Sequence, residues 1–207
     1  MKQFRNITTL IFDFGGVLIN LDLPQCIQNI QKLGFEKVDE FLSNFGQSDF
    51  FLKYEKGQID TPEFRENIRK YTSLDVTDEQ IDAAWCSFLC DIPREKIDLL
   101  LDLRKKYRLF LLSNTNPLHI DVSGGGEFAK VGLTYNDVFE RCYFSYKMGL
   151  AKPDPAIFKA LLADAGVQSK ECLFLDDGQK NIDTAASLGF QTYLVAPHED
   201  LSFLREL

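Results

Sequence analysis

The chain has 207 residues, of which 45% are hydrophobic, and its net charge at neutral pH is −8. This length and composition predict one core domain with a smaller appendage and exclude a disordered chain. An acidic chain without a basic stripe argues against nucleic acids and anionic membranes as partners. A small anionic substrate remains compatible with the charge, because a local lysine or metal can outweigh the global field.

The sequence carries no signal for export or for membrane insertion. Asp13 interrupts the apolar stretch near the N-terminus and no small-residue cleavage site follows, which argues against a signal peptide. No segment approaches the roughly 20 uninterrupted apolar residues of a membrane span. The five cysteines include no CxxC pair, as is typical of reduced thiols. We expect a cytoplasmic protein, either a monomer or a homodimer.

Five runs of apolar, β-branched or aromatic residues predict the strands. They are, in chain order, Thr8–Phe14, Arg108–Ser113, Arg141–Ser145, Glu171–Asp176 and Gln191–Val195. Several are apolar at consecutive positions, which is typical of parallel strands buried on both faces. Helical patterns separate most of them. The sequence therefore predicts an α/β fold with a doubly wound, Rossmann-like, five-stranded parallel sheet.

Residues 20–92 interrupt this alternation, because they contain helical patterns only. The predicted helices are Pro24–Leu33, Glu36–Phe45, Asp49–Lys56, Thr61–Tyr71 and Thr77–Leu89. Thr61 before a proline indicates an N-cap, and Thr77 with Gln80 indicates a capping box. We predict an α-helical cap domain over residues 20–92, inserted into a core domain formed by residues 1–19 and 93–207.

The strand–helix alternation continues after the second strand. The segment DVSGGGEF, Asp121–Phe128, predicts a flexible loop between the second and third strands. In KPDPAIFKALLADAG, Asp154 is the expected N-cap, Pro155 the first helical residue and Gly166 the stop.

Polar side chains lie at or just after the carboxyl ends of four predicted strands. They are Asp13, Ser113, Asn114, Lys152, Asp176 and Asp177. In an open parallel sheet, ligands bind outside the carboxyl ends of the strands, so these side chains are expected to converge. Carboxylates are the ligands that Mg²⁺ prefers, whereas a hydroxyl, an amide and an ammonium group can hold an anion. The helix capped by Asp154 has a positive N-terminus, which adds a positive field near Lys152.

Magnesium together with an anion most often means phosphate chemistry. Asp13 beside a phosphate can act as a nucleophile and form an aspartyl-phosphate. The metal and Lys152 would stabilise charge on the transferred group. These residues predict a phosphohydrolase that acts on a small phosphorylated metabolite.

Four segments resemble, in order and spacing, the motifs of the haloacid dehalogenase superfamily of hydrolases. They are IFDFGGVL, LFLLSNTN, KPDPAIF and FLDDGQKNIDTA. The likeness covers essentially the whole chain, and the inserted helices, with YEKGQIDTPEF, resemble the superfamily's helical cap. The Asp-x-Gly first motif with LSNTN, MG…KP and DD…N resembles most closely the bacterial α-D-glucose-1-phosphate phosphatase branch. A hexose 1-phosphate is therefore the leading substrate.

The resemblance also implies metal ligands. Asp13 would be both nucleophile and ligand, and the backbone carbonyl of Gly15 a second ligand. Asp177 would be the third, with Asp176 assisting. Asn181 stands where many relatives carry another acid, so it is expected to donate or accept a hydrogen bond near the metal.

A second set of residues would hold the phosphate. By the same resemblance, Ser113 and Asn114 would bind the phosphoryl oxygens, and Lys152 would steady the nucleophile and neutralise charge. His119 is expected in a loop, and Trp85 in the core.

The sequence departs from most phosphatases of the superfamily at Gly15, where they carry a second aspartate. That aspartate protonates the leaving group and then activates water, and such help is worth roughly 10²–10⁴-fold. Its loss leaves three explanations open: a substrate with a good leaving group, another proton donor, or a weak enzyme retained for phosphate binding. Candidate donors are Asp22, Asp49 and Glu55.

A 2-haloacid dehalogenase is the rival enzyme. Those relatives also lack the second aspartate, but they usually carry a tyrosine at that position and need no metal. Gly15 and the Asp176–Asp177 pair favour the phosphatase.

Overall fold

A computed structural model describes residues 4–43, 50–120 and 125–207 of the chain. It contains a five-stranded sheet of order β3-β2-β1-β4-β5 in which every neighbouring pair is parallel. The strands are β1 (Thr9–Phe12), β2 (Arg108–Ser113), β3 (Arg141–Phe144), β4 (Cys172–Asp176) and β5 (Gln191–Leu194). The predicted sheet is confirmed, and each strand lies within the segment predicted for it.

The central position of β1 determines where the site forms. Phe12 is in register with Leu111 of β2 and with Leu175 of β4, so these three strands end at the same edge. The chain adds β2 and β3 on one side of β1, then β4 and β5 on the other. A ligand crevice is expected at this reversal of strand order, and Asp13 follows β1 there.

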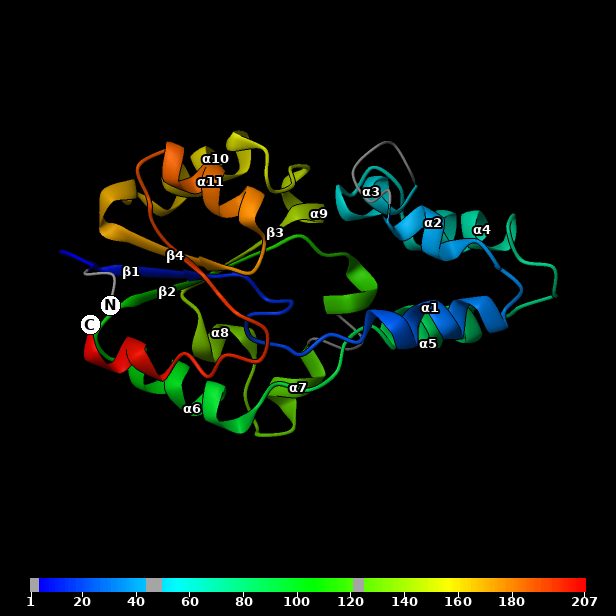
Figure 1. Cartoon of the computed structure of the whole chain (residues 1–207), viewed down its shortest axis with the longest axis horizontal. Helices are drawn as coiled ribbons and strands as arrows, with labels where there is room; N and C mark the ends of the chain where they lie inside the picture. Colours follow the sequence, from blue (N-terminus) through cyan, green and yellow to red (C-terminus); the bar gives the residue numbers. More distant parts are fainter. Residues whose placement is uncertain (1–3, 44–49, 121–124) are drawn as a thin grey trace.

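Helices cover both faces of the sheet (Figure 1). On one face, Leu10 and Phe12 pack with residues of α6 (Arg94–Leu103) and of the C-terminal η3 (Ser202–Glu206). On the other, Ile11 packs with α10 (Pro155–Ala165) and α11 (Gln179–Ser187). The remaining core elements are α7 (Gly125–Ala129), α8 (Tyr135–Val138), α9 (Ser145–Met148) and η2 (Ser169–Glu171).

The helices of the inserted segment extend beyond the carboxyl ends of the strands (Figure 1). They are α1 (Leu23–Lys32), α2 (Val38–Ser43), α3 (Phe50–Glu55), α4 (Thr61–Arg69) and α5 (Asp78–Cys86). They share a hydrophobic cluster that includes Phe51, Phe64 and Trp85. The two connections to the core run antiparallel, with a bridge between Leu21 and Leu89. The exact bounds of the cap, residues 20–92, stay a prediction.

The helix caps follow the predicted chemistry with one exception. The capping box of Thr77 and Gln80 is confirmed at α5. At α4, however, Thr61 is the first helical residue, and Asp60 is the N-cap that accepts a hydrogen bond from the Glu63 backbone N–H at 2.9 Å. An aspartate accepts this bond as readily as a threonine. The helix therefore begins one residue earlier than predicted, with Asp60 as the N-cap in place of Thr61.

Asp154 caps α10 as predicted and accepts a hydrogen bond from the Ala156 backbone N–H at 2.8 Å. Gly166 ends that helix in the left-handed conformation. The loop predicted over Asp121–Phe128 is wrong in its second half, because α7 begins at Gly125. Residues 121–124 lie outside the described residues. Across the described parts of the chain, no helix combines the length and apolar character that a bilayer crossing needs.

Candidate active site

Three carboxylates meet at the carboxyl edge of the sheet. Asp13, Asp176 and Asp177 each have an oxygen within 4.8 Å of the others. Asp13 extends the β1 pairing, because its backbone N–H donates to the Leu175 carbonyl at 2.9 Å. Its Oδ1 also accepts a hydrogen bond from the Phe14 backbone N–H at 2.7 Å, which fixes the carboxylate at the strand end. Sequence reasoning predicted this convergence.

Lys152 links two of these carboxylates. Its Nζ lies 2.8 Å from Asp13 Oδ1 and 2.7 Å from Asp176 Oδ2, and it donates to the Leu112 carbonyl at 3.0 Å. The lysine side chain is 1% exposed, and burial alone would lower its pKa. The two carboxylates outweigh that effect and hold the Lys152 pKa above its ordinary value.

Burial shifts the pKa of Asp13, the candidate nucleophile, in the opposite direction from that of Lys152. Asp13 lies in the protein interior, where desolvation raises its pKa and Lys152 opposes the rise. A cation at this cluster would favour the ionised form further, because it adds positive charge beside the carboxylates.

Asp176 is fully buried, and both of its carboxylate oxygens accept hydrogen bonds. Its Oδ1 accepts from the Gly178 backbone N–H and from the Asn181 side chain, both at 2.8 Å. The hydrogen-bonding role predicted for Asn181 is confirmed. Because Lys152 occupies the other oxygen of Asp176, this carboxylate is better placed to orient the lysine than to hold a metal on its own.

The remaining carboxylate oxygens fit a hard cation. Both hydrogen bonds of Asp13 use Oδ1, which leaves Oδ2 without a partner among the described residues. Asp177 is exposed at the same edge, and desolvation by its neighbours raises its pKa. A set of carboxylate oxygens, completed by a carbonyl such as that of Gly15, is the donor set that Mg²⁺ prefers.

Gly16 allows Asp177 to approach the first strand. Its φ is +72°, and a Cβ added there would lie 2.3 Å from Asp177 Oδ2. Gly15, by contrast, faces the pocket, and Leu21 Cδ1 would stand 3.1 Å from an added Cβ. Gly15 is thus covered by the Leu21 side chain, whereas a side chain at Gly16 would displace Asp177.

Asn114 holds Lys152 in place. Its side-chain amide donates to the Lys152 carbonyl at 2.8 Å, and its side-chain oxygen accepts from the Lys152 backbone N–H at 2.8 Å. Both polar ends of the amide are therefore engaged by main chain. Ser113 is buried, and its hydroxyl donates to the Asn114 carbonyl at 3.4 Å. Phosphate binding by Ser113 and Asn114 stays a prediction.

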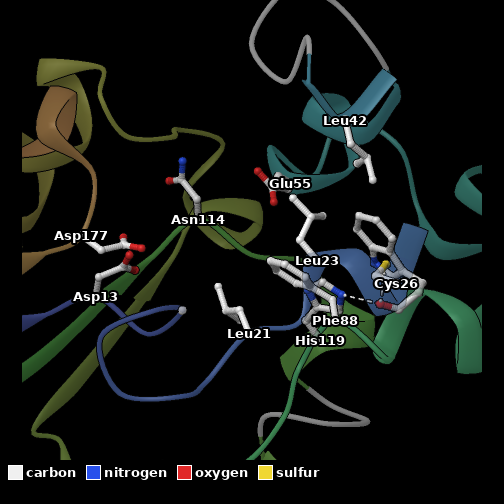
Figure 2. Close-up of a pocket in the computed structure, with 12 residues that line it drawn as sticks. Asp13, Leu21, Leu23, Cys26, Leu42, Glu55, Phe88, Asn114, His119 and Asp177 are labelled. Atoms are coloured by element: carbon white, nitrogen blue, oxygen red, sulfur yellow. Dashed lines mark hydrogen bonds between the residues drawn. The ribbon is translucent and has the colours of Figure 1, made fainter. Parts of the chain in front are cut away.

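A cavity of about 350 Å³ connects this edge to the cap. Asp13, Asp177 and Asn114 line its core end, and Figure 2 shows them across the pocket from the cap residues. Its other walls are mainly apolar and come from the cap, from the connections to it and from the segment that follows β2. They are formed by Leu21, Leu23, Cys26, Leu42, Trp85, Phe88 and His119, together with Glu55.

His119 lies in this wall, and its backbone is in a helical turn and not in a loop, so that expectation is wrong. Its ring stacks on Trp85 with 4.9 Å between centroids and on Phe88 with 5.7 Å. Burial lowers the pKa of His119 to about 4, so the ring is neutral. Trp85 is buried as predicted and also lines the cavity. No sequence pattern distinguishes such a wall from an ordinary aromatic core, because the wall is assembled from segments that are far apart in the sequence.

The three proton-donor candidates have separate outcomes. Asp22 is the N-cap of α1, accepts from the Gln25 backbone N–H at 2.9 Å, and is not among the residues that line the cavity. Asp49 lies outside the described residues. Glu55 lines the cavity and is buried.

The fold and site define an α/β enzyme with a lysine-linked acidic centre at the carboxyl edge of a parallel sheet. The sequence pattern of the haloacid dehalogenase-like hydrolases matches residues 7–189. The chain belongs to this family. The identification agrees with the predicted superfamily; membership of the glucose-1-phosphate phosphatase branch stays a prediction.

Three relatives show how far the similarity extends. The D-ribitol-5-phosphate phosphatase of Bacteroides thetaiotaomicron is 36% identical over 187 residues, 90% of this chain and 91% of that protein. A HAD family enzyme of the same organism, solved with magnesium and inorganic phosphate, has a TM-score of 0.90 and 47% identity, covering 96% of this chain and 98% of that one. A predicted HAD-like hydrolase from Porphyromonas gingivalis has a TM-score of 0.88 and 37% identity, covering 97% and 96%.

Proposed function

We propose that this chain is a magnesium-dependent phosphatase for a small phosphorylated metabolite, with Asp13 as its nucleophile. The observation that carries the proposal is the Lys152 ammonium, 2.8 Å from Asp13 and 2.7 Å from Asp176. This ion-paired group lies in an acid cluster at the core end of the pocket. The relatives support it, since one hydrolyses a sugar-alcohol phosphate and another was solved with magnesium and inorganic phosphate.

Magnesium would be held by Asp13 and Asp177 with the Gly15 carbonyl, and when bound it supplies positive charge to the phosphoryl oxygens. Lys152 supplies a second positive charge and keeps Asp13 oriented by the 2.8 Å contact. The Asp13 carboxylate attacks phosphorus, and the bond to the leaving oxygen breaks. The product of this step is an aspartyl-phosphate, which water then hydrolyses.

We propose a sugar phosphate or a sugar-alcohol phosphate as the substrate. The cavity of about 350 Å³ suits a metabolite of that size. Hexose 1-phosphate, favoured by the sequence resemblance, and ribitol 5-phosphate, the substrate of the relative from Bacteroides thetaiotaomicron, are the two compounds to compare first. The five cysteines are free, which supports a reducing, cytoplasmic location.

The test compares wild type with Asp13→Asn. Phosphate release is measured on a panel that contains D-ribitol 5-phosphate and α-D-glucose 1-phosphate, with magnesium and with chelator, and halide release is measured on 2-haloacids. We expect turnover of a phosphate ester by wild type with magnesium only, and a loss of roughly 10⁴-fold or more in the variant, as for a removed nucleophile.

Acid-quenched wild-type enzyme should carry phosphate on Asp13. Phosphate release that survives Asp13→Asn would overturn the nucleophile assignment. Halide release without metal would favour the dehalogenase, and phosphate binding without any turnover would favour the binding protein.

A further inference from the structure

Glu55 is a buried acid at the end of α3 that points into the pocket. Glu55 is only 7% exposed. Its Oε2 has no hydrogen-bond partner among the described residues. In Figure 2 the carboxyl group lies on the cap side of the pocket, across from Asp13 and Asp177. A buried polar atom without a partner is costly and is rarely retained in a purely structural position.

Glu55 lines two neighbouring cavities. One contains Asp13, Asp177 and the neutral His119; the other is lined by Lys152 and Asn114. The second cavity is also lined by Lys56 and Asp154. Glu55 is therefore the cap carboxyl group that faces the space where a phosphate ester would lie between nucleophile and cap.

The protonation state of Glu55 suits a proton donor. Desolvation raises its pKa to about 8; Lys152 opposes the rise, and Asp13 adds to it. At neutral pH the side chain is mostly a neutral acid. General acids work best when their pKa lies near the operating pH.

The turn after α3 is fixed against the core, which holds Glu55 in place. Gly57 has a φ of +63°, and a Cβ added there would lie 2.2 Å from the Tyr146 carbonyl oxygen at α9. Inside the cap, Tyr54 is buried, and its hydroxyl is 2.8 Å from the Thr61 hydroxyl. The residues on either side of Glu55 are thus held, Tyr54 by cap packing and Gly57 by cap–core contact.

The core side offers no acid at the usual position. Gly15 has no side chain, and Leu21 packs where one would extend. An acid that serves the leaving group must therefore come from elsewhere, and the cap side of the pocket presents Glu55 there.

We propose that Glu55 is the general acid that protonates the leaving oxygen and replaces the aspartate absent at Gly15. This inference rests on the proposed phosphatase function. As Asp13 bonds to phosphorus, the P–O bond of the ester breaks and its electron pair goes to the alcohol oxygen. That oxygen takes the Glu55 proton, which gives a neutral alcohol and a Glu55 carboxylate.

The second half of the reaction restores the acid. Water attacks the phosphorus of the aspartyl-phosphate and gives one proton to the Glu55 carboxylate. The bond between Asp13 and phosphorus breaks, and hydrogen phosphate leaves. One ester and one water are consumed, and one alcohol and one phosphate are formed.

The experiment compares wild type, Glu55→Gln and the matched control Glu63→Gln, an exposed glutamate of the same cap. Single-turnover rates are measured on two substrates. One is the alkyl phosphate of the panel that wild type hydrolyses fastest, whose leaving group needs a proton. The other is p-nitrophenyl phosphate, whose leaving group does not. Thermal unfolding of each variant checks the fold.

For Glu55→Gln we expect the first turnover of the alkyl phosphate to fall by roughly 10²–10⁴-fold. The burst of p-nitrophenol should stay close to wild type, and slow steady-state turnover should follow it. In wild type, kcat/KM for the alkyl phosphate should fall as pH rises through the pKa of Glu55, and the variant should lack this limb. Glu63→Gln should behave as wild type.

Equal losses on both substrates in a folded variant would overturn the proposal, because a general acid discriminates between leaving groups. A higher KM with an unchanged kcat would assign Glu55 to substrate binding instead. A failure of the phosphatase function is distinct: wild type itself would then hydrolyse none of the phosphate esters and carry no phosphate on Asp13.

Discussion

Gly16 is close enough to the acid cluster that its missing side chain matters. We expect Gly16→Ala to lose activity and magnesium affinity, because the added Cβ would lie 2.3 Å from Asp177 Oδ2 and displace that carboxylate. The left-handed backbone, with φ of +72°, adds a cost of about 1–2 kcal/mol to folding. Phosphate release as a function of magnesium concentration, together with urea unfolding, measures the two effects.

Gly132→Ala is the matched control for this glycine. Its φ is +75°, and nothing lies within 4 Å of an added Cβ. The control should show the backbone cost with unchanged magnesium dependence. If both variants respond equally to magnesium, the contact between Gly16 and Asp177 does not determine metal binding.

At the scale of elements, the contact between α3 and α9 determines how the cap meets the core. We expect Gly57→Ala to lower kcat/KM, because its Cβ would meet the Tyr146 carbonyl oxygen at 2.2 Å and push away the turn that follows Glu55. Steady-state kinetics on the panel substrate measure this effect.

Gly166→Ala serves as the control, since Gly166 has the same left-handed conformation, with φ of +64°, and open space around it. It should lose stability but keep its kcat/KM per folded molecule. An unaffected Gly57→Ala enzyme would show that cap docking does not limit turnover.

At the scale of the whole molecule, the buried acid Glu55 makes stability depend on pH. Its pKa rises from 4.5 to about 8 on folding, so the folded state binds the proton more tightly. The stabilising contribution is present below pH 4.5 and is lost as pH rises through about 8. Glu55→Gln should therefore match wild type near pH 4 and exceed its free energy of unfolding at pH 9. Urea unfolding at the two pH values tests this, and a variant less stable than wild type at pH 9 contradicts the predicted cost.

Metal binding should also be visible in global stability. A ligand that binds only the folded state stabilises it by about 2.7 kcal/mol at 100 times its Kd. We expect magnesium to raise the Tm of wild type, and to raise that of Asp177→Asn much less, because Asp177 lies within 4.8 Å of Asp13 and Asp176. Thermal unfolding with magnesium and with chelator measures the shift. Equal shifts in the two proteins would remove Asp177 from the metal site.

The sequence by itself determined the sheet and the convergence of polar side chains at its carboxyl edge. Consecutive apolar residues in β1 and β4 indicated burial on both faces, and parallel pairing brings strand ends together whatever the connections between them are. For that reason the convergence of Asp13, Lys152 and Asp177 was predictable from order alone. The hydrogen bond of Asn181 was expected from the family resemblance, because many relatives carry an acid at that position.

Only the tertiary structure decided which side chains complete the pocket. Glu55 and His119 lie in segments far apart in the sequence, and no local pattern separates a pocket wall from a core. Their roles depend on how the cap packs on the sheet, as does the selection of Glu55 over Asp22, which instead caps α1. The physical reason is that periodicity reports on a residue's own element, whereas burial without a hydrogen-bond partner arises only when separate elements pack together.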